Sequence, residues 1–307
     1  MTGNNFMSEE KPLVSICIIT YNHEKYIKQA VDSILCQRMD FSHEILIADD
    51  ASTDHTQQIL RENYSDKENV RLILREKNVG INGYMTYQEA KGKYIYLCEG
   101  DDYCVGDDSI QMLVDWLESH KDYAGVCGRR ITLSEKTGLM TINYNASQNN
   151  REISLHDILS GEMVIDMCAV LYRNFYHDGN YDYRYYLASR KVSDISREIY
   201  IFLHGNVFQL GEIVGVYRAD RIGSAASYNM THKPKEIFDE QIGILDKFEK
   251  LIGRKLEYKA IKERYTSWYV RSCVSTYEFI KHVPYIFKKV GPAITMKSIK
   301  EWVRKHG

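Results

Sequence analysis

The chain has 307 residues, a length that allows one large α/β domain or two smaller ones. Apolar residues make up 44% and charged residues 27%, which is ordinary globular usage and argues against a fibrous or disordered chain. No apolar run approaches the roughly 18 residues of a membrane span, and residues 1–11 lack the apolar stretch of a signal peptide. Seven cysteines without a Cys-x-x-Cys pair favour reduced thiols. The sequence therefore predicts a cytoplasmic protein with a flexible N-terminus.

The formal charge of −2 hides an uneven distribution of charge along the chain. Residues 251–307 contain 13 Lys and Arg but 4 Asp and Glu, so their net charge is +9 and that of the remainder is −11. A basic segment of this kind predicts an acidic partner, either the body of the protein or an anionic membrane surface. Between residues 281 and 307 lysines alternate with apolar residues, as in helices that lie in a membrane interface. Nothing in the acidic body favours nucleic acid.

The first 130 residues alternate short apolar runs with helical patterns. The apolar runs predict strands at residues 13–19, 44–48, 70–74 and 94–98. After the first run, Ile27, Val31 and Ile34 recur at helical spacing, and a third helix is predicted near residues 84–90. Strands and helices in this rhythm predict a parallel sheet with right-handed crossovers.

The rest of the chain is less regular. A helix is predicted at residues 109–120 and a strand at 125–133, whereas the polar stretch 134–151 predicts a flexible loop or lid. Two short strands are predicted at residues 207–210 and 213–217. From residue 235 onward only helical patterns remain, with breaks expected at Pro284 and Pro292.

Three polar clusters follow three of the predicted parallel strands. They are Thr20-Tyr21-Asn22, Asp49-Asp50 and Glu99-Gly100-Asp101-Asp102. The carboxyl ends of parallel strands converge on one crevice, where ligands bind. Carboxylates gathered there repel one another unless a cation joins them, which points to Mg²⁺ or Mn²⁺. The alternative is a set of solvated acidic turns. Glycine-rich dinucleotide and nucleoside-triphosphate loops are absent from the sequence.

Four segments together resemble a known family. Residues 14–22, 47–54, 78–80 and 99–102 occur in the order and spacing of family-2 glycosyltransferases with the GT-A fold. The resemblance is strong over residues 12–130 and weaker to about 225. It implies an α/β fold with a mainly parallel sheet flanked by helices. It also implies a catalytic domain at 12–225, with a nucleotide-binding half to 130 and an acceptor half from 131, and a helical basic region at 226–307.

The resemblance also assigns roles to individual residues. Tyr21 would stack on the nucleotide base and Asp50 would hydrogen-bond it, while Asp101 would bind the metal beside Asp102. Glu99 stands where the family usually has an aspartate, and it still supplies an oxygen. The remaining donor-binding positions that it implies are Thr20, Asn22, Asn78, Gly80 and Arg218. At residue 220, where many relatives have histidine, this chain has Asp220.

The family further implies a catalytic base in a late segment before a helix. Asp194 occupies that place, although Ile195 replaces the usual tryptophan after it. The alternative is that Asp194 only caps the helix, because aspartate is common at that position. His23 follows the first predicted strand, a place from which it can approach the ligand, but it is expected to be a solvated loop residue, as loop histidines more often are.

The function that the resemblance implies is an inverting transfer that depends on Mn²⁺ or Mg²⁺. A hexosyl or N-acetylhexosaminyl group would pass from a nucleoside-diphosphate sugar, first of all a UDP-sugar, to a hydroxyl of a glycan or polyprenyl-linked acceptor. Bacterial surface polysaccharide synthesis is the expected setting. A catalytically silent GT-A module that binds glycan or protein is the alternative. A sugar nucleotidyltransferase is a second rival, but its glycine-rich phosphate loop is absent.

Overall fold

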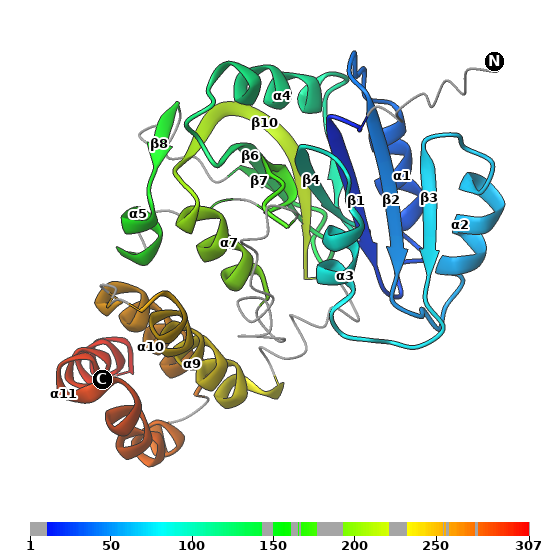
Figure 1. Cartoon of the computed structure of the whole chain (residues 1–307). Helices are drawn as coiled ribbons and strands as arrows, with labels where there is room; N and C mark the ends of the chain where they lie inside the picture. Colours follow the sequence, from blue (N-terminus) through cyan, green and yellow to red (C-terminus); the bar gives the residue numbers. More distant parts are fainter. Residues whose placement is uncertain are drawn as a thin grey trace, which may run out of the picture.

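The computed structural model describes residues 11–142, 150–160, 165, 167–176, 193–220, 232–253, 255, 258–273 and 276–306, and of residues 193–195, 252, 276, 305 and 306 the backbone alone. Figure 1 shows an α/β body built on one twisted sheet, with a group of helices at the C-terminal end of the chain beside it. The expected boundary between residues 225 and 226 lies outside the described residues.

The first half of the sheet consists of four parallel strands. They are β1 (Val14–Thr20), β2 (His43–Asp49), β3 (Val70–Leu74) and β4 (Tyr94–Glu99), in the spatial order β3-β2-β1-β4. Helices α1 (Ile27–Leu35), α2 (Thr56–Tyr64) and α3 (Asn82–Glu89) connect them. The prediction of a parallel sheet with helical crossovers is confirmed.

Alternate residues of the central strands pack on opposite faces of the sheet. Ile16 and Ile18 of β1 pack in a core with α1, α2 and α4 (Ser109–Ser119), whereas Cys17 packs on the other side. That second face is covered by α3, α5 (Leu155–Ser160) and α7 (Ser193–Leu203). A strand buried on both faces needs apolar residues at nearly every position, as β1 has.

The second half of the sheet is mixed. Strand β9 (Val170–Arg173) runs antiparallel to both β4 and β6 (Gly125–Ser134), and β6 pairs in parallel with β10 (Val207–Ala219). Short strands β5 (Tyr103–Cys104) and β8 (Arg151–Ile153) pair antiparallel with β10. A 3-10 turn, Met167–Ala169, directly precedes β9.

Two expectations for this half are wrong. The two short strands predicted around residues 211–212 form one strand, β10, because irregularities in its pairing with β6 accommodate those residues. The stretch predicted as a flexible loop from residue 134 contains β7 (Met140–Ile142), which folds back on β6 as a hairpin. Residues 143–149 lie outside the described part.

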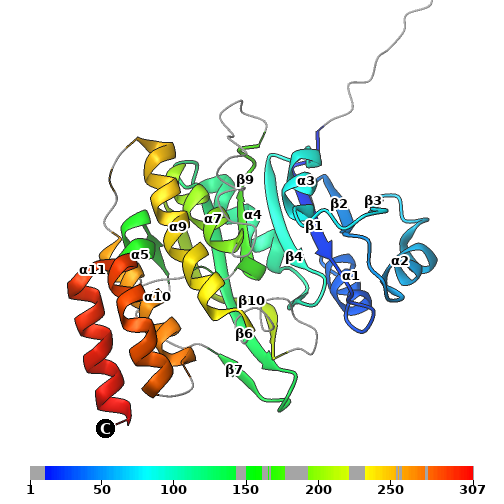
Figure 2. The same ribbon diagram turned by 90° about the horizontal axis from the view of Figure 1, so that it is seen from below.

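The C-terminal region contains α9 (Pro234–Ile252), α10 (Lys259–Ser272) and α11 (Thr276–His306). Helix α11 continues through Pro284 and breaks at Gly291, whose φ of 79° is left-handed, so the break expected at Pro284 is wrong. Figure 2 shows the two halves of α11 side by side. Phe279 of the first half stacks on Trp302 of the second with ring centroids 4.7 Å apart, as antiparallel halves require.

The basic segment packs on the helices before it. Lys297 forms an ion pair with Glu263 of α10 at 2.5 Å, and Lys289 pairs with Asp239 of α9. Phe248 and Ile286 belong to a buried cluster that also includes Ile199 of α7. Intramolecular pairing, one of the two alternatives predicted for the basic segment, is therefore found for two of its lysines, Lys289 and Lys297. Among the described helices, none has the length and apolar character needed to cross a membrane.

Candidate active site at the carboxyl ends of the central strands

The three polar clusters that follow β1, β2 and β4 lie next to one another. In the strand register Thr20 is the neighbour of Asp49, and Ile19 is the neighbour of Glu99. The amide of Gly100 donates to the carbonyl of Ile19 at 2.8 Å, which continues the pairing into the loop. The predicted convergence of these clusters is therefore confirmed.

Asp50 joins two of the loops. Its amide donates to the carbonyl of Thr20 at 3.0 Å, and its buried carboxylate accepts the amides of Val79 at 2.8 Å and Gly80 at 3.1 Å. Gly80 has a φ of +64°, a conformation that favours glycine. Asn78, one residue before Val79, is exposed. This carboxylate thus shapes the 78–80 loop and still has lone pairs for a ligand.

The loop after β1 is held by Asn22 and displays Tyr21. Asn22 has a φ of 56°, its amide donates to Ser52 at 2.8 Å, and its side-chain carbonyl accepts the amide of Thr53 at 2.8 Å. Tyr21 is 42% exposed, which leaves the residue accessible to a ligand. The hydroxyl of Thr20 is buried without a hydrogen-bond partner among the described residues. Asn22 therefore acts on the loop itself, whereas Tyr21 is open to a ligand.

Two carboxylates are buried side by side at the end of β4. Asp101 is 8% and Asp102 is 2% exposed, and Asp102 accepts the backbone amide of Arg218 at 2.9 Å. Burial, together with the neighbouring Asp101, raises the pKa of Asp102 to about 8. At neutral pH Asp102 therefore tends to keep a proton unless a bound cation stabilises its carboxylate.

His23 lies against this pair. Its Nε2 is 3.8 Å from Oδ1 of Asp101, and its side chain is buried. The expectation of a solvated loop histidine is wrong, because the chain turns after β1 and brings residue 23 over Gly100. Its place directly after the first predicted strand is the signal for the alternative, a position near the ligand.

A divalent cation fits the Asp101–Asp102 pair. Two adjacent buried carboxylates offer the hard oxygen ligands that Mn²⁺ and Mg²⁺ prefer, and a cation would offset their repulsion. Among the residues described, no group of three or more His, Cys, Asp and Glu side chains is arranged to hold a metal. The remaining ligands would therefore come from a bound phosphate group or water, as is usual for Mg²⁺.

Arg218 is held inside the protein. Its guanidinium donates to Glu135 at 2.6 Å and to Gln29, and it lies 5.0 Å from the ring centroids of both Tyr26 and Tyr103. Arg218 is 8% exposed. This side chain thus ties α1, the β6–β7 hairpin and β10 together, while its backbone amide binds Asp102.

Helix α7 places residue 194 in its first turn. Arg197, one turn later, is buried and donates to the hydroxyl of Tyr87 on α3 at 2.7 Å. Helix α3 follows directly on the 78–80 loop that Asp50 binds. The start of α7 is thereby tied to the helix that borders the site, while the side chain of Asp194 lies outside the described part. Asp220, at the end of β10, accepts the hydroxyl of Ser134 at 2.9 Å.

Gly100 offers a first test of the packed loops. A Cβ at this position would lie 2.7 Å from the Thr20 side chain and 2.9 Å from Nδ1 of His23. Gly100→Ala is expected to lower the free energy of unfolding by about 1–3 kcal/mol and to weaken nucleotide binding, since both neighbours must move. Denaturant titration and calorimetry measure the two effects. Gly243→Ala in α9, where a Cβ would meet nothing within 4 Å, is the control and should retain full nucleotide binding.

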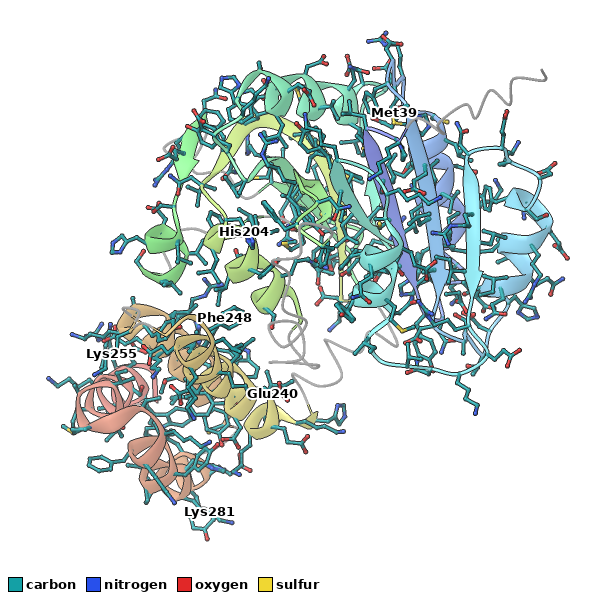
Figure 3. The ribbon with its side chains drawn as sticks, viewed as in Figure 1. Met39, His204, Glu240, Phe248, Lys255 and Lys281 are labelled. Atoms are coloured by element: carbon teal, nitrogen blue, oxygen red, sulfur yellow. The ribbon has the colours of Figure 1, made fainter. Side chains whose placement is uncertain are left out.

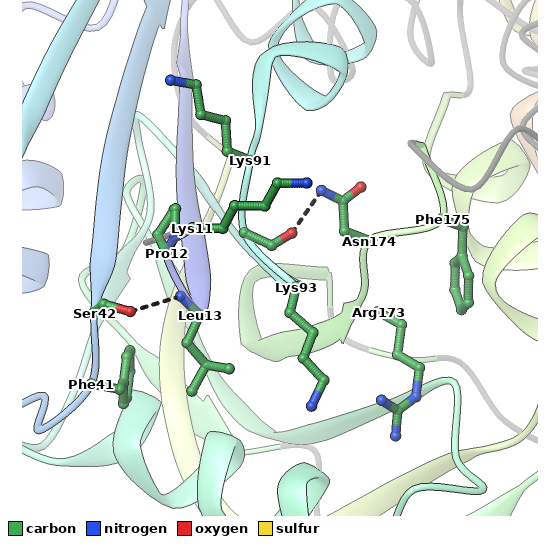
Figure 4. A pocket seen from close by; sticks show the side chains of 11 residues that line it. Lys11, Pro12, Leu13, Phe41, Ser42, Lys91, Lys93, Arg173, Asn174 and Phe175 are labelled. Carbon is green, nitrogen blue, oxygen red and sulfur yellow. Dashed lines mark hydrogen bonds between the residues drawn. The ribbon is translucent and has the colours of Figure 1, made fainter. Parts of the chain in front are cut away.

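Two surface pockets lie away from these residues. The larger, about 740 Å³, is lined by Lys11, Lys91, Lys93, Arg173 and their neighbours (Figure 4). It lies at the amino ends of β1 and β4, the edge of the sheet opposite the candidate site. The other, about 570 Å³, includes Asp108 and Trp116 of the α4 region. None of the predicted site residues lines either pocket.

Comparison with solved structures supports the fold. The chain aligns with S. aureus TarS at a TM-score of 0.62 and 17% identity, covering 92% of this chain and 50% of that one. A structure of TarS residues 1–349 with UDP-GlcNAc gives a TM-score of 0.59 at 17% identity, with 90% and 81% covered. The expected GT-A fold is confirmed.

Among the curated relatives, some match most of this chain and others match less than half of it. An uncharacterized protein of Mycobacterium tuberculosis is 28% identical over 278 residues, which are 86% of this chain and 75% of that protein. Chondroitin synthase of Escherichia coli is 32% identical over 142 residues, 46% of this chain and 20% of the synthase. Abequosyltransferase of Salmonella typhimurium is 33% identical over 128 residues, 39% of this chain and 37% of that enzyme.

The family profile described as "Glycosyl transferase family 2" matches residues 15–179, more than half of the chain and all of the strands that carry the converging clusters. The protein is therefore a member of glycosyl transferase family 2.

Proposed function

We propose that this protein transfers a sugar, with inversion, from a nucleoside-diphosphate donor to an acceptor hydroxyl, and that transfer requires Mn²⁺ or Mg²⁺. The observation that carries the proposal is the meeting of Asp50, Tyr21 and the Asp101–Asp102 pair at one edge of the sheet. The comparison with TarS, solved with UDP and with UDP-GlcNAc, favours a UDP-sugar as donor. A hexosyl or N-acetylhexosaminyl group is the sugar that we expect to be transferred.

The donor would lie across the ends of β1, β2 and β4. The exposed ring of Tyr21 would stack on the base, and Asp50 would accept a hydrogen bond from it. Thr20, Asn22, Asn78 and Gly80 would form the wall of this half of the site. Asp101 and Asp102, with Glu99 beside them, would hold Mn²⁺ or Mg²⁺. A bound cation supplies positive charge to the diphosphate as it departs.

Asp194 would act as the general base. Its carboxylate would take the proton of the acceptor hydroxyl while that oxygen attacks the anomeric carbon from the face opposite the diphosphate. The position of α7 beside α3 supports this role, because it brings the first turn of α7 near the donor loops.

The acceptor is proposed to be a glycan or a polyprenyl-linked saccharide of a bacterial surface polysaccharide. The names of the relatives support this setting, since they include a chondroitin synthase and a putative teichuronic acid biosynthesis glycosyltransferase. A lipid-linked acceptor would place the reaction at the inner face of the cell membrane.

A thermal-shift screen of nucleotide sugars with and without Mn²⁺ tests the proposal. The matching donor should raise the melting temperature, because a ligand at 100 times its Kd stabilises the native state by about 2.7 kcal/mol. The shift should be larger with Mn²⁺. Slow Mn²⁺-dependent hydrolysis of that donor would separate an enzyme from a catalytically silent module. If no nucleotide sugar shifts the melting temperature, the donor assignment is wrong.

Arg218 provides a second test, because the geometry supports a positioning role for it. Arg218→Lys keeps the charge but loses one of the two side-chain hydrogen bonds and the planar contact with Tyr26 and Tyr103. We expect a loss of about 1.5–3 kcal/mol in the free energy of unfolding and weaker binding of Mn²⁺ with UDP. Calorimetric titration measures the second effect.

The control is Arg38→Lys, whose parent side chain forms an exposed ion pair with Asp108 at 3.1 Å. Exposed pairs contribute at most about 1 kcal/mol, so this variant should bind Mn²⁺ and UDP normally. Equal binding by both variants would show that Arg218 does not position Asp102. A lysine variant that binds UDP poorly with and without Mn²⁺ would instead assign Arg218 to the donor itself.

A further inference from the structure

Helix α11 has an outward face with an unusual share of exposed apolar side chains. Among the described residues eleven large apolar side chains are exposed, and α11 carries five of them, each more than half exposed. They are Tyr277, Ile280, Phe287, Met296 and Val303. Single exposed apolar residues are normal, but a concentration on one helix marks an interaction surface.

These side chains form stripes with basic residues between them. In the first half of α11, Tyr277, Ile280, Lys281, Phe287 and Lys288 have the spacing of one helical face. The second half has a similar stripe, which consists of Met296, Lys300, Val303 and Arg304. The five residues of the first stripe define the outward face.

The opposite side of α11 is buried. Phe279, Ile286, Ile294 and Trp302 pack toward the other helices. Figure 3 shows the side chain of Lys281 at the outer edge of the molecule, directed away from the rest of the helical region. The exposed stripe is therefore a second face of a helix that already has a packed one.

The structure divides the basic residues of α11 between the two sides. Lys289 forms an ion pair with Asp239 of α9, in the acidic remainder of the chain, whereas Lys297 pairs with Glu263 of α10, within the basic segment itself. The basic residues of the two stripes are exposed and have no ion pair among the described residues: Lys281 and Lys288 in the first, Lys300 and Arg304 in the second. Glu278 is the acidic residue beside the outward face. The basic residues of α11 that lack an ion pair among the described residues thus lie on the same stripes as the exposed apolar residues.

We propose that the outward face of α11 binds the surface of an anionic membrane, with its apolar side chains among the lipid headgroups and its two basic side chains, Lys281 and Lys288, on the anionic phosphates. Alternating apolar and basic residues fit that interface, where both kinds of group are present. A second copy of the chain fits less well, because a symmetric contact would place like charges opposite each other. The proposal rests on the proposed function, which sets the acceptor at a membrane, but its test does not require donor or acceptor.

The test is co-sedimentation of the full chain with vesicles of phosphatidylcholine and phosphatidylglycerol, against vesicles of phosphatidylcholine alone. We expect binding to the anionic vesicles that weakens as salt rises. Lys281→Glu combined with Lys288→Glu should reduce the partition coefficient roughly 30-fold or more, since each basic residue near such a surface contributes about fivefold. Ile280→Ser combined with Phe287→Ser should reduce it at least tenfold without a change in charge.

The matched control is Lys67→Glu combined with Lys121→Glu, which makes the same charge change at exposed lysines of the α/β body. That variant should bind vesicles nearly as the unchanged protein does. No binding at low salt, or equal losses in the two charge-reversed variants, would overturn the proposal. A change of oligomeric state in the Lys281 and Lys288 variant, without vesicle binding by the parent, would also overturn it and assign the face to a protein contact.

Nucleotide-sugar thermal shifts on the same variants keep the two proposals apart. If an α11 variant no longer binds vesicles but a nucleotide sugar still raises its melting temperature, the defect lies in α11 alone. A parent protein that binds anionic vesicles but is stabilised by no nucleotide sugar would contradict the proposed function and leave the outward face standing.

Discussion

Replacing Asp101 with alanine is expected to abolish sugar transfer while the fold remains intact. Asp101 and Asp102 are buried side by side and would hold Mn²⁺ or Mg²⁺, which would supply positive charge to a departing diphosphate. A metal ion contributes several kcal/mol to such a step, so we expect a loss of about 10³-fold or more in kcat. Initial rates with saturating donor measure it.

Binding measurements make this prediction specific to the metal. UDP should bind the Asp101→Ala variant with the same affinity in the presence and absence of Mn²⁺, whereas the parent should gain affinity from Mn²⁺. Without metal the melting temperature should stay equal or rise, because the substitution removes one of two repelling carboxylates. Asp108→Ala, at an exposed aspartate paired with Arg38, is the control and should keep full activity. Full activity of the Asp101 variant would refute the metal assignment.

Asp194→Asn is expected to lower the rate of transfer by about 10²- to 10⁴-fold, the usual cost of losing a general base. Asparagine has nearly the same size and can still cap a helix, but its amide cannot take the proton of the acceptor hydroxyl. The affinity for the nucleotide sugar should hardly change, since the base acts on the acceptor. Single-turnover rates and donor titration together measure the effect.

A capping aspartate elsewhere in the chain is the matched control. Asp157 in the first turn of α5 accepts the amide of Ser154 at 2.7 Å, so Asp157→Asn should cost at most about 1 kcal/mol of stability and leave the rate unchanged. If Asp194→Asn behaves in the same way, losing stability but not turnover, then Asp194 is a cap and the base lies elsewhere.

The parallel half of the sheet could be predicted from local pattern. The runs at β1, β2 and β4 are apolar at nearly every position because helices cover both faces, and that requirement is visible without any tertiary contact. The convergence of Thr20, Asp50 and Glu99 follows from it, since the carboxyl ends of neighbouring parallel strands must lie at one edge.

The errors arise where contacts between distant segments outweigh local pattern. Residues 211–212 look like a turn, but pairing along β6 keeps β10 continuous. Pro284 lies inside a helix because the surrounding side chains, Ile286 among them, are buried against α9 and α10. The break in this helix falls at Gly291, next to Pro292, where the second break is predicted. In each case the deciding interactions come from residues far away in the sequence.

The sequence by itself determined the family, the parallel sheet and the edge at which its polar clusters meet, because these follow from the order and periodicity of residues along the chain. Only the tertiary structure decided the surroundings of each side chain. It buried His23 beside Asp101, enclosed Arg218 between Tyr26 and Tyr103, and left four basic residues of α11 exposed while two others form ion pairs. Burial and pairing depend on which segments pack together in three dimensions, and neighbours along the chain do not specify that.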